Sequence, residues 1–241
     1  MKLIVKDTSD EMGALAASHA AAVVNEAIGK RGNARILLST GASQFPFFKY
    51  FVKEKIDWSK VEMFHLDEYV GISKDHFASF NKYLTERFVS VVKPGKAHLI
   101  DGERDVNETI AELTGLLSES PVDLGMIGIG ENAHIAFNDP PADFEDESAY
   151  KVVTLAKTCL QQQIHEGWFK TEDEAFKQAI SMTCRQIMKC RTIISVVPYK
   201  CKADAVYKTM TGELSNEVPA TLLKTHGDYT LYCDADSASR L

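Results

Sequence analysis

The sequence is poor in cysteine and has no cysteine pair at the spacing that binds zinc. Its five cysteines are an odd number, and none of them forms a Cys-x-x-Cys motif. This pattern argues against a disulfide framework and against a structural zinc site. The thiols are therefore expected to be reduced, as they are in cytoplasmic proteins. The cysteines are Cys159, Cys184, Cys190, Cys201 and Cys233.

Long hydrophobic runs are also missing. No stretch approaches the roughly 18 apolar residues of a membrane-spanning helix. The apolar run at residues 3–5 is too short for a signal peptide. We therefore expect a cytoplasmic protein without a membrane partner.

Positive charge is in deficit, with 27 lysines and arginines against 34 aspartates and glutamates and a net charge of -7. Nucleic acid is therefore not expected as a partner, although a local basic pocket for a phosphate remains compatible with this balance. The chain shows no tail of like charges, internal repeat or linker. We expect residues 1–241 to form a single domain.

Short apolar runs alternate with helical patterns along the chain. The runs are nearly continuous and do not alternate with polar residues, which is typical of strands buried on both faces. We predict a three-layer αβα fold with a mostly parallel, Rossmann-like sheet, whose ligands bind at the carboxyl ends of the strands. The predicted strands are 3–5, 34–38, 61–66, 96–100, 122–127, 152–155, 192–197 and 229–233, and the main predicted helices are 10–30, 47–54, 79–89, 107–117 and 199–210.

A loop of small and hydroxyl-bearing residues follows the predicted strand 34–38. A strand, such a loop and then a helix can bind an anionic group on backbone N–H groups. Many turns of this composition bind no ligand, so a phosphate site and a plain turn both remain open. The loop consists of Ser39, Thr40, Gly41, Ala42 and Ser43.

Two adjacent carboxylates, Asp67 and Glu68, follow the predicted strand 61–66. A carboxylate that is partly desolvated in a pocket can accept a proton, whereas an acid that caps a helix or faces solvent does no chemistry. Lys202 is expected in the first turn of a helix, where a cation opposes the helix dipole unless an anion lies nearby. Lys202 is therefore a candidate phosphate ligand, with a solvated lysine as the alternative.

A glycine-rich loop with a histidine follows the predicted strand 122–127. Asn132 and Asp139 give His134 possible orienting partners, which an acid/base histidine needs. A surface histidine in a turn is the alternative. Because the loops 39–44, 67–71 and 128–139 each follow a strand end, we expect them to meet at one edge of the sheet.

Two of these stretches resemble the glucosamine-6-phosphate deaminase family, also called the glucosamine/galactosamine-6-phosphate isomerases. They are Asp67-Glu68-Tyr69-Val70-Gly71 and Gly-Ile-Gly-Glu-Asn-Ala-His-Ile-Ala-Phe-Asn at residues 128–138. The loop 39–43 is similar to the family's phosphate turn, and residues 219–223 are similar to its C-terminal region. The resemblance covers essentially the whole chain.

The resemblance implies an enzyme that needs no metal or organic cofactor and whose small-molecule partner is a sugar phosphate. Glucosamine 6-phosphate and water would give fructose 6-phosphate and ammonia, in amino-sugar catabolism. His134 would assist ring opening, and Asp67 would move a proton from C2 to C1 through an enolamine. Asn132, Asp139 and Glu68 would complete the catalytic group, and the loop 39–43 with Lys202 would hold the phosphate.

The sequence departs from the family pattern at several positions. Some members have aspartate at Asn132, and the family usually has glutamate at Asp139. Ala42 replaces a common glycine of the phosphate turn. A phosphate-binding arginine of some members has no clear match near residues 161–168, and Arg185 is the substitute that we consider.

Two other functions remain as alternatives. A 6-phosphogluconolactonase of the same fold needs the histidine to activate water but no base at Asp67, so the carboxylate motif favours the deaminase. A non-catalytic sugar-phosphate sensor would normally carry a DNA-binding module, for which a first strand at Leu3 leaves no room. The sequence leaves open the preferred amino sugar, allosteric control and a homo-oligomer.

Overall fold

A computed structural model describes residues 1–165, 167–171 and 173–241 of the chain. Its main feature is a seven-stranded sheet in the order β1-β10-β9-β6-β2-β3-β5, in which all neighbouring strands are parallel. The predicted α/β fold with a mostly parallel sheet is therefore confirmed. The strands are β1 Lys2–Lys6, β2 Ala34–Leu38, β3 Val61–His65, β5 Lys96–His98, β6 Leu124–Met126, β9 Thr192–Val197 and β10 Tyr229–Asp234.

A second sheet was not predicted. It has three antiparallel strands in the order β4-β8-β7, which are β4 Asp67–Tyr69, β8 Gln178–Met182 and β7 Tyr150–Thr154. Only Leu66 separates β3 from β4, so the chain passes directly from the large sheet to the small one. Residues 67–69, which the sequence predicts as a loop, form a strand because their main chain pairs with residues 179–181.

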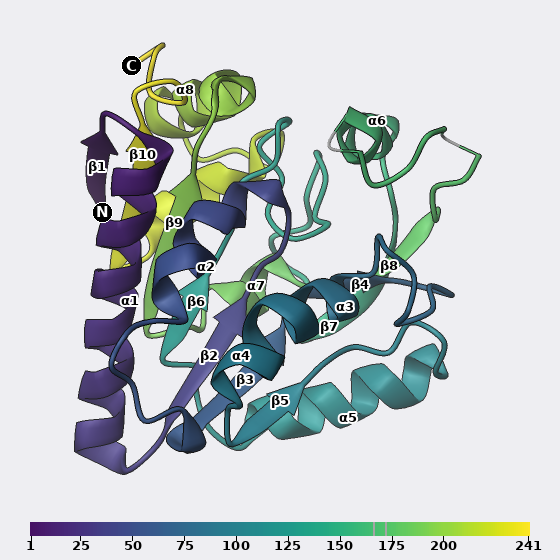
Figure 1. Ribbon diagram of the computed structural model, residues 1–241. Coiled ribbons are helices and arrows are strands. Elements are labelled where there is room, and N and C mark those ends of the chain that lie inside the picture. The colour runs from purple at the N-terminus through teal and green to yellow at the C-terminus, as the bar shows by residue number, and fades with distance from the viewer. Residues whose placement is uncertain (166, 172) are drawn as a thin grey trace.

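Helices lie on both faces of the large sheet, as Figure 1 shows with α1 and α5. Successive side chains of a strand pack into two different cores. In β2, Ile36 and Leu38 pack with α1 and α2, whereas Leu37 packs with residues of α5. Burial of both faces explains why the strands are apolar at nearly every position. The helices are α1 Ser9–Arg31, α2 Phe45–Phe51, α3 Phe80–Leu84, α4 Ser90–Val92, α5 Val106–Ser118, α6 Lys157–His165, α7 Cys184–Ile187 and α8 Ala203–Thr211.

Within the described residues, five further helical segments connect these elements. Four are 3-10 helices, and η3 is a π-helical segment that joins α3 to α4. None of the helices in the described part of the chain has the length and apolarity needed to cross a membrane. The segments are η1 Ala42–Gln44, η2 Trp58–Lys60, η3 Thr85–Val89, η4 Lys200–Lys202 and η5 Pro219–Thr225.

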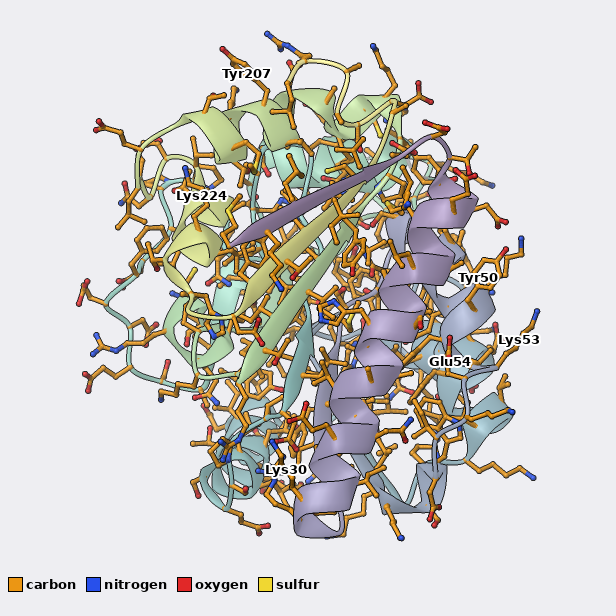
Figure 2. The ribbon with its side chains drawn as sticks, turned by 90° about the vertical axis from the view of Figure 1, so that its left-hand side faces the viewer. Lys30, Tyr50, Lys53, Glu54, Tyr207 and Lys224 are labelled. Atoms are coloured by element: carbon orange, nitrogen blue, oxygen red, sulfur yellow. The ribbon has the colours of Figure 1, made fainter. Side chains whose placement is uncertain are left out.

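The long helix α1 begins at Ser9, one residue before the start that the sequence predicts. Thr8 is the cap: its hydroxyl accepts from the N–H of Glu11, whose carboxylate accepts from the N–H of Thr8, both at 3.2 Å. A Cβ at Gly13 would overlap the backbone of Pro46, so glycine lets α1 approach α2 closely. Figure 2 shows α1 along the sheet, with Lys30 near the end of this helix. This packing fixes α2, which follows the phosphate-turn candidate.

None of the described cysteines forms a disulfide. Cys184, Cys190 and Cys233 are buried and Cys201 is exposed. The side chain of Cys159 lies outside the part of the chain that is described.

Candidate active site

A pocket lies at the carboxyl ends of the strands of the large sheet. It is lined by residues of all three predicted loops: Ser39 to Gly41 with Ser43, Asp67, and Gly128 to Gly130 with His134. Figure 1 shows this end of the sheet at the top, with α8 on one side and α6 on the other. The structure therefore brings together the loops that the sequence places at one sheet edge.

The turn after β2 is held by backbone hydrogen bonds. The N–H of Ser39 donates to the carbonyl of Met126 at 3.1 Å, and the N–H of Gln44 donates to the carbonyl of Gly41 at 3.1 Å. Gly41 has a φ of 95°, in the region that favours glycine. The Ser39 hydroxyl is buried in the pocket wall and has no hydrogen-bond partner among the described residues. It can therefore donate to a bound anion. Ala42 begins η1 and does not line the pocket.

Lys202 brings a positive charge to the same turn. It ends η4, is only 3% exposed and lines the pocket. The backbone before it is fixed by Asp234, whose carboxylate oxygens accept from the N–H of Tyr199 at 3.0 and 3.1 Å. Among the described lining residues, Lys202 is the single lysine or arginine. A lysine held this deeply beside the turn is suited to a phosphate.

Asp67 lines the same pocket. Its backbone pairs with Ser181 of β8, and its side chain is nearly buried. Burial raises the pKa of Asp67 to about 8, and the negative charge of Glu68 adds to the shift. No described group donates a hydrogen bond to the Asp67 carboxylate that would lower its pKa. An ionised Asp67 is therefore a stronger base than an exposed aspartate.

Glu68 does not line the pocket, although the sequence groups it with the catalytic residues. Successive side chains of a strand point to opposite faces, so Glu68 points away from the face that Asp67 occupies. It is fully buried and accepts from the hydroxyl of Ser79 at 2.8 Å and from the N–H groups of Phe80 and Asn81 at 3.2 and 2.7 Å. Burial raises the pKa of Glu68 to about 7, against the effect of these hydrogen bonds.

The loop after β6 is shaped around His134. The N–H of Gly130 donates to the carbonyl of His134 at 2.9 Å, and a Cβ at Gly130 would lie within 3.0 Å of the imidazole. Only glycine fits at this position without moving the ring. The far end of the chain supports the loop, since the N–H of Ala220 in η5 donates to the carbonyl of Ala133 at 2.9 Å.

Asn132 and Asp139 fix the orientation of the His134 ring. The Asn132 amide nitrogen donates to Asp139 at 2.9 Å, which leaves the Asn132 oxygen to accept from His134 Nδ1 at 2.6 Å. Because an amide oxygen only accepts, Nδ1 carries the proton, and Nε2 of the neutral ring is free to take one. Asp139 also accepts from the N–H of Ala156 at 3.0 Å.

The carboxylate of Asp139 lies 3.4 Å from His134 Nδ1. Burial acts to raise the pKa of Asp139, but its contacts with His134, Asn132 and the Ala156 N–H outweigh burial and hold the pKa below its usual value. A negative charge is therefore available to an imidazolium, even though asparagine occupies position 132.

Arg185 lies outside the pocket, so the structure does not support it as the substitute for a phosphate-binding arginine. Its side chain is 43% exposed and pairs with Glu145 at 3.2 Å and Glu147 at 3.3 Å. These acids belong to the acidic stretch 143–147. The two carboxylates hold the guanidinium at the surface, outside the pocket lining.

The helix α6 contributes two lining residues that sequence reasoning missed. The Gln162 side-chain oxygen accepts from the N–H of Glu131 at 2.9 Å, and that of Gln163 accepts from the hydroxyl of Tyr69 at 2.8 Å. The run of three glutamines at 161–163 is visible in the sequence, but nothing in it separates pocket residues from solvated ones. Within the described ranges, no cluster of three or more histidine, cysteine or carboxylate side chains is arranged to hold a metal ion.

Comparisons with known proteins agree with this architecture. The family model described as Glucosamine-6-phosphate isomerases/6-phosphogluconolactonase matches residues 7–232. The glucosamine-6-phosphate deaminase of Staphylococcus epidermidis is 34% identical over 248 aligned positions, covering 99% of this chain and 98% of that protein. The solved structure of a monomeric glucosamine-6-phosphate deaminase superposes with a TM-score of 0.91 at 28% identity, covering 99% of both chains.

A 6-phosphogluconolactonase of Thermotoga maritima shares the fold, with a TM-score of 0.79, 13% identity and coverage of 97% of this chain and 98% of that one. At this level of identity the likeness concerns the fold alone. Family membership is shown by two other findings: the family model matches most of the chain, and the Staphylococcus epidermidis deaminase is 34% identical to it. The chain belongs to the family of glucosamine-6-phosphate isomerases and 6-phosphogluconolactonases.

Proposed function

We propose that this protein is a glucosamine-6-phosphate deaminase, which converts glucosamine 6-phosphate and water to fructose 6-phosphate and ammonia. The observation that carries the proposal is the buried Asp67 carboxylate, which shares one pocket with His134 and the turn at Gly41. The deaminases among the relatives support the same reaction. A lactonase needs no base at the position of Asp67.

The reaction needs two proton transfers at different atoms of the sugar. His134 Nε2 takes the proton of the anomeric hydroxyl and returns it to the ring oxygen, which opens the ring. Asp67 then removes the proton from C2 of the open-chain aldehyde and delivers it to C1, through an enolamine. The resulting imine at C2 reacts with water to release ammonia and leave the ketone. A desolvated carboxylate suits proton removal next to a carbonyl.

The turn at residues 39–43 and Lys202 hold the phosphate of the substrate. Phosphate is remote from C1 and C2, so its binding energy orients the reacting carbons and is not consumed in the chemistry. The Ser39 hydroxyl and the buried Lys202 ammonium supply donors for this purpose.

Replacement of Lys202 by glutamine is expected to raise KM for glucosamine 6-phosphate by about 10-fold, because a charged hydrogen bond to the phosphate is lost. Steady-state kinetics would check this, with the exposed Lys208→Gln in α8 as a control. An unchanged KM would show that Lys202 does not bind the phosphate.

The value of kcat/KM for ammonia release is also expected to depend on pH. Only ionised Asp67 can accept the C2 proton, and burial raises its pKa to about 8. Below that pKa, kcat/KM is expected to increase about tenfold per pH unit, and above it to level off. A profile between pH 5.5 and 9 would test this expectation, and a profile flat from pH 5.5 upward would contradict it.

The decisive assay mixes the purified protein with glucosamine 6-phosphate and follows both ammonia and fructose 6-phosphate. Galactosamine 6-phosphate and 6-phosphogluconolactone run in parallel. Release of ammonia supports the deaminase, and hydrolysis of the lactone alone supports the lactonase. Binding of the phosphosugar without turnover supports a non-catalytic sensor.

We also propose that residues 1–241 act as one domain, in the cytoplasm and in the catabolism of N-acetylglucosamine. Pairing of β1 with β10 supports the single domain, because both ends of the chain then belong to one sheet. Described cysteines that form no disulfide are compatible with a reducing compartment.

A further inference from the structure

The carboxylate of Glu68 accepts hydrogen bonds from the start of a helix, and this helix also contacts the phosphate turn. Ser79 caps this helix, and its hydroxyl donates to Glu68 at 2.8 Å. The N–H groups of Phe80 and Asn81 donate to the same carboxylate. These N–H groups belong to the first turn of a helix and have no partner within it. Glu68 therefore takes the place of water or of a second capping residue.

The helix continues without interruption from α3 through η3 to α4, over residues 80–92. Two of its residues reach the site. Phe80 lines the pocket, and the hydroxyl of Tyr83 donates to the carbonyl of Gly41 at 3.0 Å. The Tyr83 ring stacks on Phe45 of α2 with centroids 5.7 Å apart. The helix is thus fastened to β4 at one end and to the phosphate turn one turn later.

We propose that Glu68 is a positioning residue, which couples the base at Asp67 to the phosphate turn at Gly41 through the helix 80–92. Asp67 and Glu68 are neighbours on one short strand, so a displacement of one moves the other. The chain of contacts runs from Glu68 to Ser79 and the following N–H groups, and from Tyr83 to Gly41. What the turn binds rests on the function proposed above.

A carboxylate is the group that this position requires. The two oxygens of Glu68 accept from Ser79, Phe80 and Asn81 and from the N–H of Tyr69 at 3.0 Å. Glutamine has one acceptor oxygen, and its NH₂ group would face N–H donors. Buried donors would lose their partner, which is costly, and the start of the helix would move.

The experiment compares Glu68→Gln, Tyr83→Phe and the double variant. Asp105→Ala is the control, because Asp105 caps α5 by accepting from the N–H of Glu108 at 2.9 Å, away from the pocket. Calorimetric titration with inorganic phosphate gives Kd, and kinetics with glucosamine 6-phosphate give KM and kcat. Thermal unfolding of each variant shows that it is folded.

Each single variant is expected to raise the phosphate Kd and KM by about 5- to 30-fold. The Kd and KM of the double variant should not exceed those of the single variant that binds phosphate more weakly, because both changes interrupt the same connection. Asp105→Ala should lower thermal stability, because the helix loses its cap, and should leave Kd and KM unchanged. A helix cap with only a structural role would lower stability in the same way but would not affect phosphate binding.

An unchanged phosphate Kd in Glu68→Gln, or effects that multiply in the double variant, would overturn the proposal. If Glu68→Gln does not fold, Ser79→Ala removes one donor to the carboxylate and is judged by the same Kd. Wild-type protein that binds phosphate but releases no ammonia would overturn the proposed function, while the phosphate titrations would still decide the role of Glu68. Wild-type protein that binds no phosphate would overturn both.

Discussion

Replacement of Asp67 by asparagine is expected to lower ammonia release from glucosamine 6-phosphate by about 10²- to 10⁴-fold. Positioned general bases contribute rate factors of this size, and asparagine of the same shape cannot take the C2 proton. The loss should fall on kcat, because the phosphate contacts at Gly41 and Lys202 remain. Exchange of the C2 proton with solvent deuterium should slow in parallel.

The matched control is Asp75→Asn, which removes the same charge from an exposed loop. Its rate should equal that of the wild-type protein. If Asp67→Asn turned over at the wild-type rate, another group would have to be the base, and the assignment of Asp67 would be wrong.

The same substitution is expected to stabilise the fold at neutral and alkaline pH. An exposed aspartate ionises near 3.8, whereas burial raises the pKa of Asp67 to about 8. Between these values the folded protein binds the proton more tightly than the unfolded chain, so the contribution of Asp67 to stability falls as pH rises. Asparagine does not titrate. The variant should therefore gain a few degrees in Tm at pH 8.5 and little at pH 5.

Thermal unfolding of both proteins between pH 5 and 8.5 measures this gain. A variant that is inactive yet more stable would separate loss of the base from loss of the fold. A lower Tm for Asp67→Asn at pH 8.5 would show that the carboxylate is stabilised by contacts in the folded protein.

Replacement of Gly130 by alanine is expected to lower kcat/KM by about 10²-fold, although it adds only a methyl group. The new Cβ would lie within 3.0 Å of the His134 imidazole, so the ring must move. A displacement of about 1 Å in a reacting group costs rates of this order. The hydrogen bond from Nδ1 to Asn132 would be lost or lengthened at the same time.

Gly115→Ala in α5 is the control, since no atom lies within 4 Å of a Cβ at that position. It should keep full activity and gain some stability, because alanine favours a helix more than glycine. Imidazole ¹⁵N chemical shifts would report the ring of His134 directly. Full activity of Gly130→Ala with an unshifted imidazole would contradict the close packing described for this loop.

Much of this fold could be predicted from the sequence, because the large sheet depends on local patterns. β2 and β9 are apolar at almost every position, and both were predicted with the bounds that the structure has. The contacts of the small sheet are long-range. Nothing near residues 67–69 indicates that they pair with residues 179–181, so the direction in which Glu68 points could not be derived.

The site residues also differ in how far their positions could be predicted from the sequence. His134 is predictable because Gly130 and the hydrogen-bond partner Asn132 lie within four residues of it. The position of Arg185 depends on Glu145 and Glu147, which are distant in the sequence. The placement of Gln163 depends on the hydroxyl of Tyr69, a contact between α6 and β4 that no periodicity encodes.

The site is divided between two sheets, and this division affects how ligand binding changes local unfolding. The base belongs to the three-stranded sheet, whereas the phosphate turn and His134 follow strands of the seven-stranded sheet. A sugar phosphate that contacts both adds a removable cross-link between the two sheets. Occupancy should therefore slow amide hydrogen exchange in β8, whose residues 178–182 do not line the pocket.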